Sequence, residues 1–211
     1  MIARRAAFRH PAGEPAPRTA LLLPGFKRHA NTRAFVPAAS NYRWLEKLQE
    51  YRPESIAGSL GQLLFLASLR MAGMPKLDSV THSLVVTFHT EQPWLTLEDR
   101  DELWSAFGVP VYEQMYCASG LLATECIAHD GLHAAKGAQW TVDANGELWF
   151  REPLSWWEER GEAYAPSGLF GAVDPEPCEC GQPGIRLRIA GPVQRQTLLR
   201  TRALSAWAQV A

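Results

Sequence analysis

The chain has 211 residues, of which 46% are hydrophobic and 20% charged, a composition typical of a folded globular protein. Its 21 basic and 22 acidic residues are mixed along the sequence, so we expect no basic surface that would bind nucleic acid. The longest apolar runs, ALLLPGF and LLFLASL, are far shorter than the ~20 residues that span a bilayer, and no apolar segment follows the basic start of the chain. We therefore expect a cytoplasmic protein with neither nucleic-acid nor membrane partners.

The first part of the sequence predicts an arm followed by alternating strands and helices. Residues 1–18 are rich in Arg, Ala and Pro without a sustained period, and we expect a loose arm there. Buried strands are predicted in TALLL, in a short apolar segment around Ile56 and Ala57, in SLVVTFHT and in VPVYEQMY. Helices are predicted in NYRWLEKLQEYRP, over Leu60 to Leu69, and in TLEDRDELWSAFG, where Thr96 is the expected N-cap and Gly108 the end. This alternation implies βαβ crossovers and a mainly parallel sheet over 55–118.

The remaining residues predict a different, β-rich structure. AQWTVDANGELWFREPLSW alternates about the turn residues DANG, which indicates a β-hairpin. GIRLRIAG and RQTLLRTRAL predict further strands or a final short helix. The sequence therefore predicts an α/β part over 19–118 and a β-rich part over 119–211 of the same domain.

The cysteines are the residues most suited to chemistry. Cys117, Cys126, Cys178 and Cys180 occur in a chain without an apparent export signal, so thiols or metal ligands are expected rather than disulfides. Zinc requires four converging ligands, often supplied as two close pairs from separate loops. CEC, within DPEPCECGQPG, supplies one pair, and Cys126 with a histidine of TECIAHDGLHAA supplies the other.

The spacing alone leaves several interpretations open. A lone cysteine or histidine is often a packed core residue, the C-x-C pair is also compatible with a redox couple, and either His129 or His133 fits as the fourth ligand. A catalytic Cys/His pair is a further alternative, but no base or oxyanion hole is evident around Cys126. The sequence has neither a G-x-S-x-G elbow nor a P-loop.

Several segments, in order over about residues 42–200, resemble the phenylacetate-CoA ligase family of adenylate-forming enzymes and its coenzyme F synthetase-like relatives. DELWSAFGVPVYEQMYCASG resembles the family's fG helix followed by its v...Yg.tE strand and loop. ATECIAHDGLHA resembles..EC....GlH, and PCECGQPGIRLRIAG resembles pCpCGr..pRi. The resemblance implies part of an adenylate-forming, acyl-CoA synthetase-like N-terminal domain, with βαβ units plus a small β-rich part that contains zinc.

The resemblance also assigns residues. In family members with both motifs the cysteines and the GlH histidine hold a structural zinc ion, which gives Cys126, His133, Cys178 and Cys180 as ligands and ranks His133 above His129. Tyr116 and Ser119 correspond to a remnant of the nucleotide-binding loop.

The sequence departs from the family pattern at the residues that serve ATP. The first 41 residues contain no phosphate loop, and Gly120 stands where the glutamate for nucleotide-bound magnesium is found. Gly171 stands at the ribose aspartate position, with Asp174 as a shifted candidate, and GPVQRQ lacks the charged hinge residues. Without these groups little remains to orient a triphosphate, so ATP with magnesium is a doubtful cofactor.

Three functions follow as hypotheses. The first is a zinc-binding, adenylate-forming-like domain without independent ATP-dependent ligase activity. The second is an acyl-activating subunit of the acyl-CoA ligase type, whose ATP-binding half is supplied by a protein partner. The third is a small acyl- or aryl-ligand-binding protein with a pocket lined by aromatic residues: Tyr112, Tyr116, Trp140 and Trp149.

Overall fold

The computed structural model describes residues 8–11, 15–23, 31–38, 42–74, 76–89, 94–117, 120–151 and 164–192. Its elements in chain order are β1 (Thr19–Leu21), β2 (Thr32–Ala34), α1 (Arg43–Tyr51), β3 (Ser55–Gly58), α2 (Leu60–Met71), β4 (Ser83–His89), α3 (Leu97–Phe107), β5 (Val111–Cys117), β6 (Gly120–Glu125), β7 (Leu132–Ala134), β8 (Gln139–Val142), β9 (Glu147–Arg151), β10 (Ala165–Asp174) and β11 (Arg186–Pro192).

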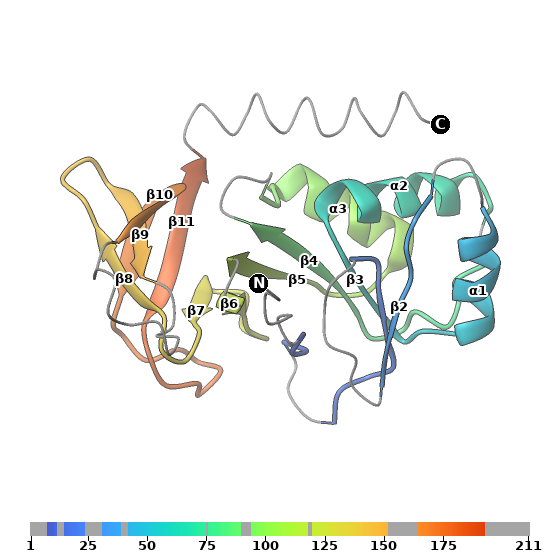
Figure 1. Cartoon of the computed structure of the whole chain (residues 1–211), viewed down its shortest axis with the longest axis horizontal. Helices are drawn as coiled ribbons and strands as arrows, with labels where there is room; N and C mark the ends of the chain where they lie inside the picture. The colour runs from blue at the N-terminus through green and yellow to red at the C-terminus, as the bar shows by residue number, and fades with distance from the viewer. Residues whose placement is uncertain are drawn as a thin grey trace, which may run out of the picture.

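All these strands belong to one 11-stranded sheet with the order β2-β1-β3-β4-β5-β6-β7-β11-β10-β9-β8. The strands from β2 to β5 pair in parallel, and those from β5 onward pair antiparallel. Figure 1 shows the helices beside the parallel strands and the β8–β11 strands at the end of the molecule farthest from α1. The fold is therefore a mixed α/β structure dominated by its sheet.

The helices of the parallel part begin and end where local signals predict. The side chain of Thr96 accepts a hydrogen bond from the N–H of Asp99, whose carboxylate accepts the N–H of Thr96, and Gly108 ends α3 in the left-handed conformation with φ 67°. Ser59 and Gln62 form the same capping box at the start of α2. The predicted helices and the parallel pairing of β3, β4 and β5 are confirmed.

Alternate residues of the parallel strands face two different hydrophobic clusters. The larger cluster joins the strands to the helices and contains residues such as Leu48, Ile56, Leu63, Leu84 and Leu103. On the other face a smaller cluster is formed by Phe8, Leu21, Ala57 and Val85.

A buried histidine accompanies Phe8 on this second face. The Nε2 atom of His10 lies 3.2 Å from the hydroxyl of Ser55 and 3.0 Å from that of Ser83, at the starts of β3 and β4. Burial and, secondly, the charge of His82 lower the pKa of His10 to about 4. Residues 8–11 thus pack on this face of the sheet, with the imidazole of His10 in its neutral form.

The antiparallel part contains the predicted hairpin and three strands that were not predicted. The carboxylate of Asp143 accepts the N–H groups of Asn145 and Glu147 and closes the β8–β9 turn. The unpredicted strands of this part are β6, β7 and β10, and β2 of the parallel part was not predicted either. RQTLLRTRAL lies outside the described residues. The β7–β11 ladder consists of two residue pairs, in which Leu132 faces Leu187 and His133 faces Arg186.

Among the helices of the described ranges, none has both the length and the apolar character required to cross a bilayer.

Candidate metal centre

The four residues expected to bind metal converge at the junction of β7 and β11. Cys126 directly follows β6, His133 lies in the middle of β7, and Cys178 and Cys180 lie in the loop between β10 and β11. One ligand atom of each residue lies within 4.8 Å of those of all the others. Two segments about 50 residues apart in sequence therefore form a cluster that could hold a metal ion.

The measured distances fit the edges of a tetrahedron around a zinc-sized ion. The sulfurs of Cys126 and Cys178 are 3.6 Å apart, and the sulfur of Cys180 lies 3.3 Å from Nε2 of His133. Zinc bound at about 2.3 Å from sulfur and about 2.0 Å from nitrogen requires edges of about 3.8 Å and about 3.5 Å. These two donor pairs therefore lie within a few tenths of an ångström of tetrahedral edges, and all four donor atoms lie within 4.8 Å of one another.

Each cysteine sulfur of the cluster accepts a hydrogen bond from the backbone N–H of the residue two positions later in the sequence. The sulfur of Cys180 accepts the N–H of Gln182 at 3.4 Å, that of Cys178 accepts the N–H of Cys180, and that of Cys126 accepts the N–H of Ala128. Hydrogen bonds of this kind favour the thiolate, which is the form that binds metal. Both segments thus present their cysteines in turns suited to ligation.

The thiols differ in how readily they ionise without a cation. The N–H of Cys180 is the main cause that lowers the pKa of Cys178 to about 6. Burial raises the pKa of Cys126 to about 12. A divalent cation at the centre would favour the thiolate of every cysteine ligand.

His129 does not belong to the cluster. Its Nδ1 lies 2.9 Å from the carboxylate of Glu125, and its ring stacks on Tyr112 with 4.9 Å between centroids. Its backbone has φ 51°, and its N–H donates to the carbonyl of Cys126. The structure thus separates the two histidines that the spacing left open and brings only His133 to the cysteines.

Glycine at position 131 permits the β6–β7 turn to approach β11. Gly131 has φ 90°, and a Cβ atom there would lie 2.7 Å from the carbonyl oxygen of Leu187. A side chain at this position would separate the segment that carries His133 from the strand that follows the CEC loop.

A buried arginine joins the same two segments and was not identified from the sequence. The guanidinium of Arg186 contacts Asp130 of the β6–β7 turn and lies 2.7 Å from the carboxylate of Asp174 at the end of β10. Arg188 contacts the same two carboxylates. Burial opposes the charge of Arg186, but Asp130 and Asp174 outweigh it and raise its pKa. The one available signal was an arginine inside the apolar strand GIRLRIAG.

A second polar cluster borders the metal centre on the side of α3. A cavity of about 290 Å³ is lined in part by Arg100, Glu113, Glu125 and His129. Arg100 lies 3.2 Å from Glu125 and 3.5 Å from Glu113, so one guanidinium serves two buried carboxyl groups. Burial and, secondly, the charge of Glu125 raise the pKa of Glu113 to about 8.

The residues that the family resemblance assigns to nucleotide binding make other contacts in the structure or lie outside its described part. Tyr116 is buried and its hydroxyl donates to Gln114 at 3.0 Å, while Ser119 lies outside the described residues. At Gly171 a Cβ atom would collide with the carbonyl oxygen of Arg188, so the backbone leaves no room for an aspartate. Asp174, the alternative, is committed to its arginine partners.

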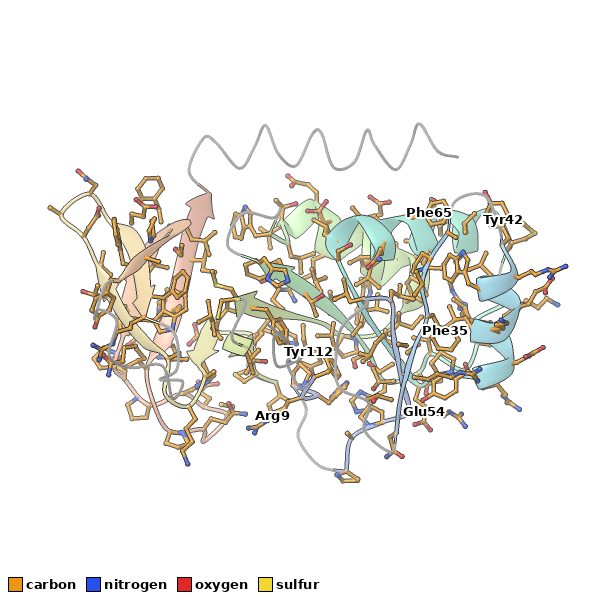
Figure 2. The ribbon with its side chains drawn as sticks, viewed as in Figure 1. Arg9, Phe35, Tyr42, Glu54, Phe65 and Tyr112 are labelled. Carbon is orange, nitrogen blue, oxygen red and sulfur yellow. The ribbon has the colours of Figure 1, made fainter. Side chains whose placement is uncertain are left out.

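The aromatic residues considered as a ligand pocket do not line the described cavities. Tyr112 stacks on His129, and Trp140 packs against Phe150 with 5.6 Å between ring centroids. Neither the cavity beside α3 nor a larger one between β2 and α1 is lined by Tyr112, Tyr116, Trp140 or Trp149. Figure 2 labels Tyr112 near the middle of the molecule.

No family model matches the chain, and no curated protein matches it. Solved structures do resemble it. An open conformation of a 2-hydroxyisobutyryl-CoA ligase has a TM-score of 0.58 at 16% identity over 78% of this chain. An acyl-CoA synthetase (AMP-forming)/AMP-acid ligase II-like protein from Dyadobacter fermentans has a TM-score of 0.52 at 14% identity over 85% of this chain. An amide bond synthetase from Marinactinospora thermotolerans has a TM-score of 0.53 at 14% identity over 91% of this chain.

The chain spans less than half of each of these proteins, namely 40%, 49% and 44% of their lengths in the same order. At such identities the likeness concerns the fold alone. The chain therefore has the fold of a portion of the adenylate-forming acyl-CoA ligases and their structural relatives.

Proposed function

We propose that the chain is a zinc-binding domain with an adenylate-forming-ligase fold, in which zinc is structural and no ATP-dependent ligase activity resides in this chain alone. The observation that carries the proposal is the convergence of four donor atoms within 4.8 Å from the β6–β7 and β10–β11 segments. Three thiolates and one imidazole in a tetrahedral arrangement suit zinc.

The closed donor set supports a structural role. Catalytic zinc sites commonly have three protein ligands and leave a position for water or substrate, whereas structural sites have four. The zinc would join the β6–β7 turn to the CEC loop, the same two segments that Arg186 connects through Asp130 and Asp174. Both contacts hold the short β7–β11 ladder together.

The absence of ligase activity is proposed from the residues at the equivalent positions. Glycine replaces the expected carboxylate at 120, and at 171 the backbone of β11 excludes one. A carboxylate that binds magnesium and one that orients the ribose are both needed to position ATP for attack by an acid. Of the two residues assigned to the nucleotide loop, Tyr116 donates its hydroxyl to Gln114 of the same strand.

Metal analysis and an activity assay test the two halves of this proposal separately. Protein purified under reducing conditions should contain one equivalent of zinc, and cobalt substitution should give the absorption bands of tetrahedral thiolate ligation. The Cys180→Ser variant should lose both, while Cys117→Ser should retain them because Cys117 is outside the cluster. Protein without zinc, or with unchanged zinc in Cys180→Ser, would refute the metal assignment.

The activity arm measures carboxylate-dependent exchange of pyrophosphate into ATP across a panel of aryl and acyl acids. No exchange is expected from the zinc-loaded chain. Exchange above background by the chain alone would refute the second half of the proposal and leave the first intact.

A further inference from the structure

A cleft between β2 and α1, distant in the fold from the metal centre, has the character of an anion site. Its volume is about 830 Å³, within the range of small-molecule sites. Residues from β2 and from the following link to Ala38 form one wall, and α1 forms the other. Figure 2 labels Phe35 and Tyr42 at this end of the molecule.

The charged side chains of the cleft are all basic. Arg33, Arg43 and Lys47 line it, and no aspartate or glutamate does so among the described lining residues. The acidic residues of α1, Glu46 and Glu50, are exposed elsewhere on the helix. The cleft therefore concentrates positive charge that its own lining does not neutralise.

Two of these cations have no ion-pair partner in the described part of the chain, namely Arg33 and Lys47. Both side chains belong to exposed residues at the mouth of the cleft. Because exposed cations of this kind retain their water and their hydrogen-bonding capacity, they are available to an incoming anion.

The sequence of α1 directs its cationic and aromatic side chains to the same side. Arg43, Lys47 and Tyr51 follow one another at intervals of four residues, so they form a stripe along one face of the helix. Opposite this stripe the guanidinium of Arg33 lies 5.4 Å from the ring centroid of Phe35 and 5.8 Å from that of Tyr51. Stacking on rings restricts the arginine and leaves the edge of its guanidinium for a ligand.

We propose that this cleft binds a small organic diphosphate, with Arg33 and Lys47 on the phosphate groups. Arginine matches phosphate oxygens in a bidentate manner, and Lys47 supplies a cation for the second phosphate. The partly exposed ring of Tyr51 in the same lining gives the organic part an aromatic contact. The site is independent of the proposed zinc centre, because none of its residues is near the cysteine ligands in the sheet order.

Isothermal titration of the zinc-loaded protein without magnesium tests the proposal. The first probe is ADP, which has both a diphosphate and an organic ring system. Inorganic pyrophosphate carries the diphosphate charge alone, and adenosine carries the organic part alone. We expect ADP to bind most tightly, pyrophosphate less tightly and adenosine least, and ADP binding to weaken as salt is raised.

Charge variants locate the binding. The double variant Arg33→Gln/Lys47→Gln should weaken ADP binding by about tenfold or more, because it removes both cations that would contact the phosphate groups. The control Lys76→Gln/Lys136→Gln removes the same charge from exposed residues outside the cleft and should leave the affinity within about twofold.

Three results would overturn the assignment. One is no binding of ADP or pyrophosphate at millimolar concentration, and another is an equal loss of affinity in the cleft and control variants. The third is displacement of ADP by an octaglutamate peptide that binds more tightly than ADP, which would assign the cleft to an acidic protein segment. Zinc content measured on the same samples shows whether the variants retain the fold.

Discussion

Removal of zinc should cost the chain about 4 kcal/mol of unfolding free energy. The ion would link Cys126 to Cys178, which are 52 residues apart in sequence. For a cross-link that closes a loop of this length, the chain-entropy relation gives a stabilisation of about 4 kcal/mol at 25 °C, because the unfolded chain loses conformational freedom. One S–S and one S–N distance are already close to those of a tetrahedral site, so these two donor pairs need to move little to bind the ion.

Urea denaturation followed by circular dichroism measures this difference. The zinc-loaded protein, the same protein with a chelator, Cys126→Ser and Cys117→Ser are compared in the presence of a phosphine reductant, which keeps the cysteines from forming a disulfide. Chelation and Cys126→Ser should each lower the unfolding free energy by roughly 4 kcal/mol, and Cys117→Ser by less than about 1 kcal/mol. Equal unfolding curves with and without chelator, or equal losses in the two serine variants, would refute the reasoning.

Three further predictions concern single positions. As the pH falls from 6.5 to 4, the unfolding free energy of the wild type should decrease by up to about 3 kcal/mol relative to that of His10→Gln. The reason is that the imidazole takes up a proton near its ordinary pKa in the unfolded chain, whereas in the folded chain its pKa is about 4. A difference between the two denaturation midpoints that does not change with pH would contradict this. Gly131→Ala should lower the unfolding free energy by at least about 1 kcal/mol more than Gly73→Ala does, and it should weaken zinc binding. Both glycines have φ near 90°, but only at Gly131 would the added Cβ atom meet another backbone segment. Equal decreases in melting temperature would show that this close approach is unimportant. Gly171→Asp should lower the melting temperature and restore no pyrophosphate exchange, since its Cβ atom meets the backbone of β11; a stable variant with exchange activity would reverse the interpretation of that site.

The helices and the strands β1, β3, β4 and β5 of the parallel part were predictable because their signals are local, whereas the three-residue strand β2 was not predicted. Thr96 and Gly108 mark the ends of α3 through a capping box and a left-handed cap, and each depends on residues within the same helix. The strands β6, β7 and β10 carry no comparable signal. The three residues of β7 are too few for a period of two to be recognised, and their partners in β11 lie more than 50 residues away.

The sequence predicted which four side chains lie together at the candidate site, but not the residues that support them. Spacing could not distinguish His129 from His133, because the difference arises from the left-handed backbone of His129 and the hydrogen bond of its ring to Glu125. The resemblance to a family favoured His133, which the structure brings to the cysteines. The burial of Arg186 and its ion pairs were not predictable. In GIRLRIAG the arginines alternate with apolar residues, as exposed residues of a strand do, and the partners of Arg186 come from two other segments.

The β7–β11 ladder, with its two residue pairs, determines how the molecule can come apart. It is the shortest ladder among the described strands, and within the described residues the parallel strands and the β8–β11 strands are joined in the sheet only through it. The cysteine and histidine cluster lies beside these two pairs. A bound metal would join the two ends of the sheet a second time at this point, so local opening of the ladder would be rarer with metal than without it. Amide hydrogen exchange in β7 and β11 would then report whether the site is occupied.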